Sequence, residues 1–205
     1  MLVFKVSNIL LLMIVLFDFE ITIENLVLLG SLSEGVDLCV ANSKLEGSKC
    51  NWHRFPGLAY KLQKPLATFL LFKNGKFICT GVKTENKGEQ AITNFVNLLK
   101  TQNIVSHDCV FQWGVKNLVA SVNIGGASVS LEQFTNEFDA IYEPDKFPAA
   151  IHKTDESSAT FLVFLTGKLI CSGVADKEAL KKTVKDFYDQ LVEKKVIEKS
   201  LSPNS

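Results

Sequence analysis

The sequence lacks several features that would assign a function directly, and each absence excludes a class of protein. Lys plus Arg and Asp plus Glu are equal at 22 each, so the net charge gives no sign of a polyanionic partner. The five cysteines are an odd number without a CxxC pair, which argues against a zinc site or a disulfide framework and for a reducing compartment. No nucleophile, metal-binding or phosphate-loop pattern occurs, and the three histidines stand in unrelated contexts. We therefore expect neither an enzyme nor a cofactor.

The chain has little that could enter a membrane. Its long apolar run, Ile9–Phe17, has the size of a signal-peptide core and is too short to span a bilayer as a helix. The basic flank is only Lys5, and no cleavage site of small residues follows. Residues 1–16 are therefore set apart as an N-terminal apolar extension. A signal or anchor, a non-functional extension and a true translation start at Met13 remain open.

What the sequence does contain is one stretch that occurs twice, at a constant offset of 92 residues. A gapless register over this span is not expected by chance, so the chain is an internal repeat. The predicted organisation is a first repeat at 17–106, a second at 107–199 and a tail at 200–205. The recurring segments are Asn25-Leu26-Val27 with Asn117-Leu118-Val119, Phe55-Pro56 with Phe147-Pro148, Ala67–Phe72 with Ala159–Phe164, and Gly75–Val82 with Gly167–Val174.

Each repeat has the pattern of an antiparallel sheet with helices on one side, an α+β unit. Strict alternation of apolar and polar residues from residue 17, and again at 111–117, predicts half-buried strands. Short helices are expected within 36–47 and at 131–138, and longer amphipathic helices after the caps Thr84 and Asp176. The remaining strands are predicted at 55–63, 67–73, 76–83, 147–154, 159–165 and 168–175, with tight turns at Asn74-Gly75 and Thr166-Gly167.

Both faces of these strands are apolar, yet each repeat supplies helices for only one face. Because neighbouring side chains of a strand point to opposite faces, one apolar face is expected to be open to a partner. Two asparagines lie on that face, each two residues before a valine, and four lysines border it. The face collects Asn25, Val27, Leu70, Phe72, Ile78 and Thr80, then Asn117, Val119, Leu162, Phe164, Ile170 and Ser172, with Lys61, Lys76, Lys153 and Lys168 at its edges.

These motifs resemble those of the TATA-box-binding protein family, in a divergent, archaeal-type form. The resemblance rests on Asn-x-Val, Phe-Pro, (Leu/Val)-Phe, Gly-Lys and (Thr/Ser)-Gly in both repeats and on Tyr142–Pro148, and it covers about residues 18–197. It implies two pseudo-symmetric repeats, each an antiparallel sheet with two helices, that form one continuous saddle-shaped sheet. It implies a general initiation factor that binds the minor groove of TATA-box DNA, bends it and recruits a B-type initiation factor and RNA polymerase. The expected location is an archaeal cytoplasm or a eukaryotic nucleus.

The resemblance also implies a role for each site residue. Phe55 with Phe72, and Phe147 with Phe164, would be wedge pairs that enter base steps, and we expect the rings of Phe72 and Phe164 to be exposed in the free protein. Asn25 and Asn117 would donate hydrogen bonds to minor-groove acceptors. The floor, which is the part of the open face that meets sugars and base edges, would consist of Val27, Val119, Leu70, Leu162, Ile78, Ile170, Thr80 and Ser172. The phosphate contacts would be made by Arg54, Lys61, Lys76, Lys153 and Lys168. The partner-binding loop would present Glu143 and Asp145.

Two other functions remain open from the sequence. A divergent relative could use the same face to bind a protein, since the second repeat has Asp155-Glu156 where the first has Gln63-Lys64, and Ala175 where the first has Lys83. A membrane-tethered or secreted protein is suggested only by the N-terminal run. The presence of phenylalanine at all four wedge positions favours DNA.

Overall fold

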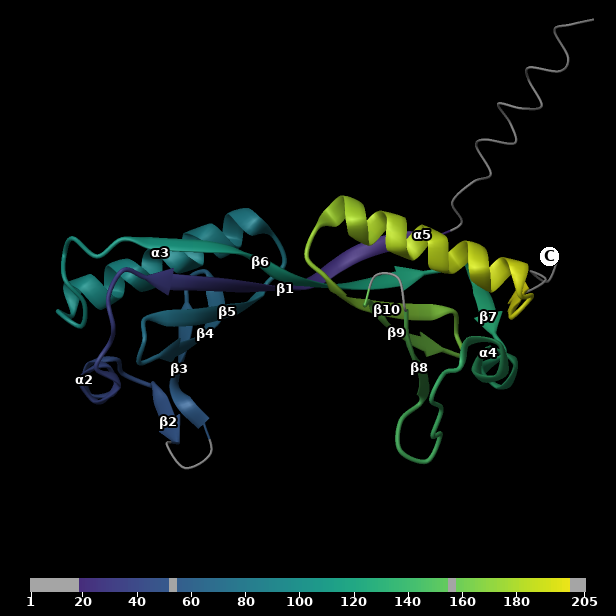
Figure 1. Ribbon diagram of the computed structural model, residues 1–205, viewed down its shortest axis with the longest axis horizontal. Helices are drawn as coiled ribbons and strands as arrows, with labels where there is room; N and C mark the ends of the chain where they lie inside the picture. The colour runs from purple at the N-terminus through teal and green to yellow at the C-terminus, as the bar shows by residue number, and fades with distance from the viewer. Residues whose placement is uncertain (1–18, 52–54, 155–157, 200–205) are drawn as a thin grey trace, which may run out of the picture. The chain divides into compact units, whose positions relative to one another are not determined.

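The computed structural model describes residues 19–51, 55–154 and 158–199 (Figure 1). Their strands follow the order β2-β3-β4-β5-β1-β6-β10-β9-β8 in a nine-stranded sheet, and β11 and β7 form a separate pair. The chain divides into two compact units. The first-repeat unit consists of Ile23–Val119 and Gly173–Leu180, and the second-repeat unit of the described parts of Met1–Thr22, Ala120–Ser172 and Lys181–Ser205.

In the first-repeat unit, an antiparallel sheet carries one long helix. Strand β3 pairs with β4, β4 with β5, and β5 with β1. Side chains cap both helices of this part, since Asp37 accepts hydrogen bonds from the backbone N–H groups of Cys39 and Val40, and Thr84 accepts one from Lys87. The elements are β1 (Glu20–Leu32), α2 (Leu38–Lys44), β2 (Lys49–Asn51), β3 (Phe55–Gln63), β4 (Leu66–Phe72), β5 (Lys76–Val82), α3 (Glu85–Thr101) and β6 (Phe111–Asn123), of which β1 and β6 extend into the other unit.

The core of this unit lies between the sheet and α3. Phe69 of β4 stacks on Phe95 of α3, with ring centroids 4.0 Å apart and planes 17° from parallel. Cys79 is fully buried on the same side, and burial raises the pKa of its thiol to about 12. This cysteine is therefore a small buried hydrophobic residue, and all five cysteines of the chain are free thiols.

The second-repeat unit has the same plan. Phe161 stacks on Phe187 at 3.9 Å and 16°, and both residues lie 92 positions after the stacked pair of the first repeat. Strand β9 pairs with β8 and with β10, antiparallel in both cases. The elements are β7 (Ala127–Val129), α4 (Leu131–Phe138), β8 (Ala149–Lys153), β9 (Thr160–Phe164), β10 (Lys168–Val174), α5 (Lys177–Glu193) and β11 (Ile197–Lys199), of which β10 and α5 extend into the other unit.

Both predicted tight turns are formed, and each needs its glycine. The N–H of Gly75 donates to the carbonyl of Phe72, and the N–H of Gly167 to that of Phe164, each at 3.0 Å. Both glycines have a positive φ, and a Cβ there would lie 2.2 Å from the carbonyl oxygen of Glu34 or 2.0 Å from that of Ala127. No other residue fits either turn without displacing a neighbouring backbone.

The predicted α+β class with two antiparallel repeats is confirmed. The predicted strand at 55–63 has the bounds of β3, and those at 67–73, 76–83, 147–154, 159–165 and 168–175 agree within two residues at each end. Strand β6 ends six residues beyond the alternation at 111–117 that predicted it. No sequence pattern indicated the three-residue strands β2, β7 and β11. Within the described residues, no helix is long and apolar enough to cross a membrane, and the apolar run Ile9–Phe17 lies outside them.

Candidate nucleic-acid interface

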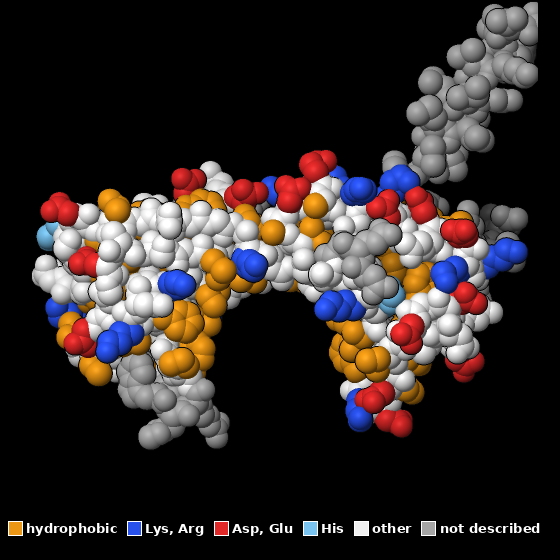
Figure 2. Space-filling model, viewed as in Figure 1, with side chains coloured by type: hydrophobic (Ala, Val, Ile, Leu, Met, Phe, Trp, Pro, Cys, Tyr) orange, Lys and Arg blue, Asp and Glu red, His pale blue; other side chains and the backbone are white. Residues whose placement is uncertain are grey.

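In the first-repeat unit, the predicted floor residues lie together on the sheet face opposite α3. Val27 pairs with Thr80 across β1 and β5, and Leu70 pairs with Ile78 across β4 and β5. Each of these side chains is half-buried, whereas the residue that precedes each of them on its strand is buried. Figure 2 shows hydrophobic side chains exposed at the β3–β4 end of this unit. The expected open apolar face is present here.

The second-repeat unit presents an equivalent face. Leu162 of β9 pairs with Ile170 of β10, and Ser172 pairs with Thr160. These four side chains are half-buried, and Ile151, which pairs with Leu162 from β8, is 39% exposed. Val119 is also half-buried, on the part of β6 that belongs to the first-repeat unit. Apolar side chains are exposed at the β8–β9 end of this unit as well (Figure 2).

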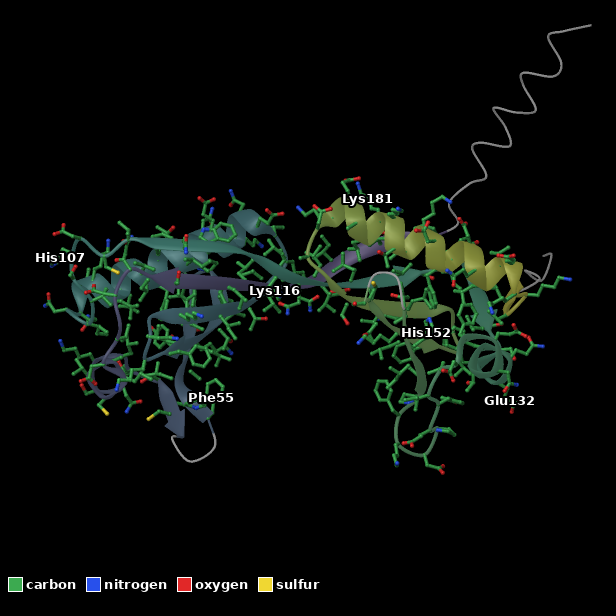
Figure 3. The ribbon with its side chains drawn as sticks, viewed as in Figure 1. Phe55, His107, Lys116, Glu132, His152 and Lys181 are labelled. Atoms are coloured by element: carbon green, nitrogen blue, oxygen red, sulfur yellow. The ribbon has the colours of Figure 1, made fainter. Side chains whose placement is uncertain are left out.

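Each unit carries one pair of phenylalanine rings in edge-to-face contact. The centroids of Phe55 and Phe72 are 5.5 Å apart with planes at 60°, and those of Phe147 and Phe164 are 6.2 Å apart at 63°. Phe72 and Phe164, which were predicted to be exposed, are not the exposed rings of their pairs. Phe55, labelled in Figure 3, and Phe147 are 36% and 40% exposed, but Phe72 and Phe164 are half-buried because the outer ring of each pair covers the inner one.

The two pairs differ in the residue beneath them. Phe72 pairs across the sheet with Gly57, whereas Phe164 pairs with Ala149. A Cβ on Gly57 would lie 2.6 Å from the Phe55 ring and 3.1 Å from the carbonyl oxygen of Leu71. The missing side chain therefore makes room for Phe55 and permits the closer ring contact of the first repeat.

Two asparagines hold their side-chain amides against backbone N–H groups. Oδ1 of Asn25 accepts from the N–H of Gly81 at 2.9 Å, and Oδ1 of Asn117 accepts from that of Gly173 at 2.7 Å. The Nδ2 group of Asn25 also donates to Oγ1 of Thr80 at 2.9 Å. Among the described residues, no acceptor for Nδ2 of Asn117 is present. In both asparagines the Nδ2 donor therefore points away from the backbone N–H group. The Nδ2 group of Asn117 remains available to a ligand, whereas that of Asn25 is bonded to Thr80.

Sequence reasoning missed Leu29 as part of this surface. Leu29 is 40% exposed, pairs with Ile78, and with Pro56 and Phe72 lines a largely apolar pocket of about 510 Å³. The residue at the offset of 92 is Ser121, so Leu29 is not among the residues that recur in both repeats. The alternation from Asn25 through Val27 is the signal that could have found it.

The predicted phosphate-contacting lysines are all exposed. By strand alternation, Lys76 shares a face with Ile78 and Thr80, and Lys168 shares one with Ile170. Lys61 and Lys153 are exposed at equivalent places on β3 and β8. None of the four forms an ion pair with another described residue. The fifth predicted contact, Arg54, lies outside the described residues.

The loop before β8 carries the predicted partner residues. Glu143 and Asp145 are exposed, and the carboxylate of Glu143 forms an ion pair of 2.7 Å with Lys146. The carbonyl of Glu143 accepts from the N–H groups of Lys146 and Phe147, at 2.9 Å each. This turn joins the acidic positions directly to the second phenylalanine pair.

Comparison with known proteins agrees with this arrangement. The family model "Transcription factor TFIID (or TATA-binding protein, TBP)" matches residues 20–102 and 112–194, one segment in each repeat. The TATA-box-binding protein of Methanobrevibacter smithii is 34% identical over 178 residues, 86% of this chain and 97% of that protein. TATA-box-binding protein 3 of Methanosarcina acetivorans is 38% identical over 157 residues, 75% of this chain and 84% of that protein. The solved Methanococcus jannaschii TBP matches with a TM-score of 0.76 and 29% identity, over 85% of this chain and 99% of its own.

Proposed function

The chain belongs to the TATA-binding protein family, and from that premise we propose that it binds the minor groove of AT-rich promoter DNA and bends it. The family is one of transcription factors, so the chain acts in transcription initiation and is not an enzyme. The observation that carries the proposal is that each repeat places an edge-to-face phenylalanine pair beside an uncovered apolar sheet face. The function places the chain where promoter DNA is, in an archaeal cytoplasm or a nucleus.

The floor supplies the selectivity for AT-rich DNA. In the minor groove, A·T pairs present only acceptors, whereas a G·C pair adds the amino group of guanine. Val27, Leu70 and Ile78 offer no acceptor to that amino group, so a G·C pair would bury an unsatisfied donor against them. The amide nitrogen of Asn117 supplies a donor for the acceptors that remain.

The phenylalanine pairs supply the bend. Wedging of apolar side chains between base steps is the mode known for this family and is carried over here to this chain. Full burial of a phenylalanine ring is worth about 1.5–3 kcal/mol, and unstacking a base step costs a few kcal/mol. Because Phe72 and Phe164 are already half-buried in the free protein, their gain is smaller than this. The floor and the exposed lysines therefore have to provide most of the net affinity.

Recruitment of a B-type initiation factor, and through it RNA polymerase, completes the proposal. The loop of Glu143 and Asp145 is exposed and sits directly before Phe147, so a partner bound there is held beside one end of the DNA site. The first repeat has Asn51 and His53 at these positions. Two carboxylates on one repeat alone give the complex a direction, which a two-fold symmetric factor could not give.

A binding experiment tests the proposal. Fluorescence anisotropy of the whole chain with a TATA-containing duplex, in competition with a GC-rich duplex of equal length, should show preference for the first. Equal affinity for the two duplexes would contradict minor-groove selectivity. Failure to bind either duplex would favour the other reading of the face, in which it binds a protein.

A further inference from the structure

The second-repeat unit contains a pocket on the helical side of its sheet. It has a volume of about 450 Å³, within the range of ligand-binding pockets. On β8, His152 alternates with Ile151 and Lys153, so it faces the pocket while these neighbours belong to the floor side (Figure 3 labels His152). The pocket is lined from α4, β8, α5 and the residues after them by Asn136, Glu137, Phe138, Asp139, His152, Thr154, Thr183, Asp186, Phe187, Gln190 and Lys194.

Three aromatic rings line the pocket, and a lysine already lies over one of them. Phe138 and Phe187 are only 6% and 2% exposed, so the ring surface open to a ligand is mainly that of the half-buried His152. The rings of His152 and Phe187 are stacked at 5.7 Å and 13°, and Phe138 meets both of them edge-on at 5.5 and 5.6 Å. The Nζ atom of Lys194 lies 4.9 Å from the centre of the Phe138 ring. It also donates to the carbonyl oxygen of Glu137 at 2.6 Å. A positive group on a flexible stem is therefore accommodated against these rings.

The charge of the pocket favours a further cation. Three carboxylates line it, those of Glu137, Asp139 and Asp186, against the single ammonium of Lys194. Lys194 lies 3.4 Å from the carboxylate of Glu137. Lys185, the neighbour of Asp186, is engaged by Asp189 at 2.5 Å. The pocket thus keeps an excess of negative charge beside stacked rings.

The first repeat shows that the fold does not require these polar side chains. At the offset of 92, Thr154 and Thr183 correspond to Leu62 and Ala91, which are buried. The ring stack itself is kept, since Tyr60 lies on Phe95 at 5.8 Å and 25°. The first repeat also has Leu45, Gly47 and Asn94 at the positions of Glu137, Asp139 and Asp186. The two threonines and three carboxylates of the lining are therefore particular to the second repeat.

We propose that this pocket binds the guanidinium group of an arginine side chain from a basic segment of a protein partner. A planar guanidinium stacks on aromatic faces and forms paired hydrogen bonds with carboxylates, two features that an ammonium lacks together. The site lies on the side of the sheet away from the floor, so it can be filled while DNA is bound. The proposal does not depend on DNA binding by the chain.

Titration with a small probe tests the proposal. We would record NMR spectra of the whole chain with the blocked tripeptide acetyl-Gly-Arg-Gly-amide, and with the same peptide carrying citrulline, which has the shape of arginine without its charge. Saturable shifts confined to 136–139, 152–154 and 183–194 are expected for the arginine peptide only. Equal shifts with both peptides, or shifts spread over the whole surface, would overturn the proposal.

Variants separate this pocket from general surface charge. Asp186→Asn should weaken binding of the arginine peptide about threefold, in line with a partly exposed ion pair. Glu193→Gln makes the same charge change on the same helix but outside the pocket and without breaking the Lys185–Asp189 pair, and it should leave binding unchanged. Lys194→Gln removes the competing cation, so it should strengthen binding by a similar factor. Weaker binding by a Lys194→Gln variant with an unchanged melting curve, or equal losses in the Asp186→Asn and Glu193→Gln variants, would contradict the site.

Discussion

Asn117 and Gly173 are joined by a hydrogen bond of 2.7 Å from the backbone N–H of the glycine to Oδ1 of the asparagine. A backbone N–H can only donate, so the amide atom facing it is oxygen, and this fixes which end of the side chain is which. The Nδ2 donor consequently points away from Gly173. The same relationship joins Asn25 to Gly81 at 2.9 Å, but there the donor is shared with Thr80.

This difference predicts unequal effects of removing the two asparagines. Asn117→Ala should weaken binding to TATA DNA by about 1–3 kcal/mol, because a base acceptor loses its donor in a water-poor interface. Asn25→Ala should weaken it by less, because Asn25 must first give up its contact with Thr80. Anisotropy on a TATA duplex and on a random duplex checks both variants. Equal losses on the two duplexes would mean that these side chains are structural.

The phenylalanine pairs predict a separation of bending from stability. Phe55→Ala and Phe147→Ala should reduce the bend with little effect on folding, because these rings are the more exposed members of their pairs. Phe72→Ala and Phe164→Ala should abolish the bend and also destabilise the protein by about 1–3 kcal/mol, less than for a fully buried ring. Energy transfer between dyes at the duplex ends reports the bend, and urea unfolding reports the stability. A normal bend in the Phe72 and Phe164 double variant would refute the wedge role.

Gly57 offers a subtler change at the same place. Gly57→Ala should push the Phe55 ring outward, since the new methyl group would lie 2.6 Å from it, and the bend should decrease although no wedge ring is removed. The matched control is Ala149→Gly, which gives the second repeat the residue of the first and introduces no clash. The same energy-transfer assay applies. An unchanged bend in Gly57→Ala would show that the position of the Phe55 ring is not critical.

The architecture could be predicted from the sequence because each pattern that indicates a strand or helix occurs in both repeats. Alternation defined β3, β4 and β5, and the offset of 92 carried the same strands into the second repeat. Strands β7 and β11 were missed because each has three residues and pairs with a segment about 70 positions away. A strand of three residues is too short to show an alternation of apolar and polar side chains, and its pairing depends on tertiary packing.

The site was predictable as a set of residues but not as a geometry. Leu29 was missed because its counterpart is Ser121, and the shielding of Phe72 by Phe55 depends on a ring contact that no pattern encodes. The orientation of the Asn117 amide depends on the backbone of Gly173, 56 residues away. Alternation assigns a side chain to a face of the sheet, whereas its exposure and direction depend on neighbours from other strands.

The acidic loop predicts a defect in assembly rather than in DNA binding. Asp145→Arg combined with Glu143→Arg should leave TATA binding intact and prevent the ternary complex with the cognate B-type factor, because like charges across an interface cost several kcal/mol. Glu143→Arg alone also frees Lys146, so Asp145→Arg is the cleaner single change. A supershift on preformed complexes measures recruitment. Undiminished recruitment by the double variant would exclude this loop as the docking site.

The central claim is that the chain reads the minor groove, and base substitution in the DNA tests it most directly. An inosine·cytosine pair has the minor-groove surface of an A·T pair and the major-groove surface of a G·C pair, since it lacks only the guanine amino group. Anisotropy should therefore show that a TATA duplex rebuilt with I·C pairs binds nearly as tightly as the original, and that the same duplex with G·C pairs binds far more weakly. Equal weakness of the I·C and G·C duplexes would contradict minor-groove recognition by this face.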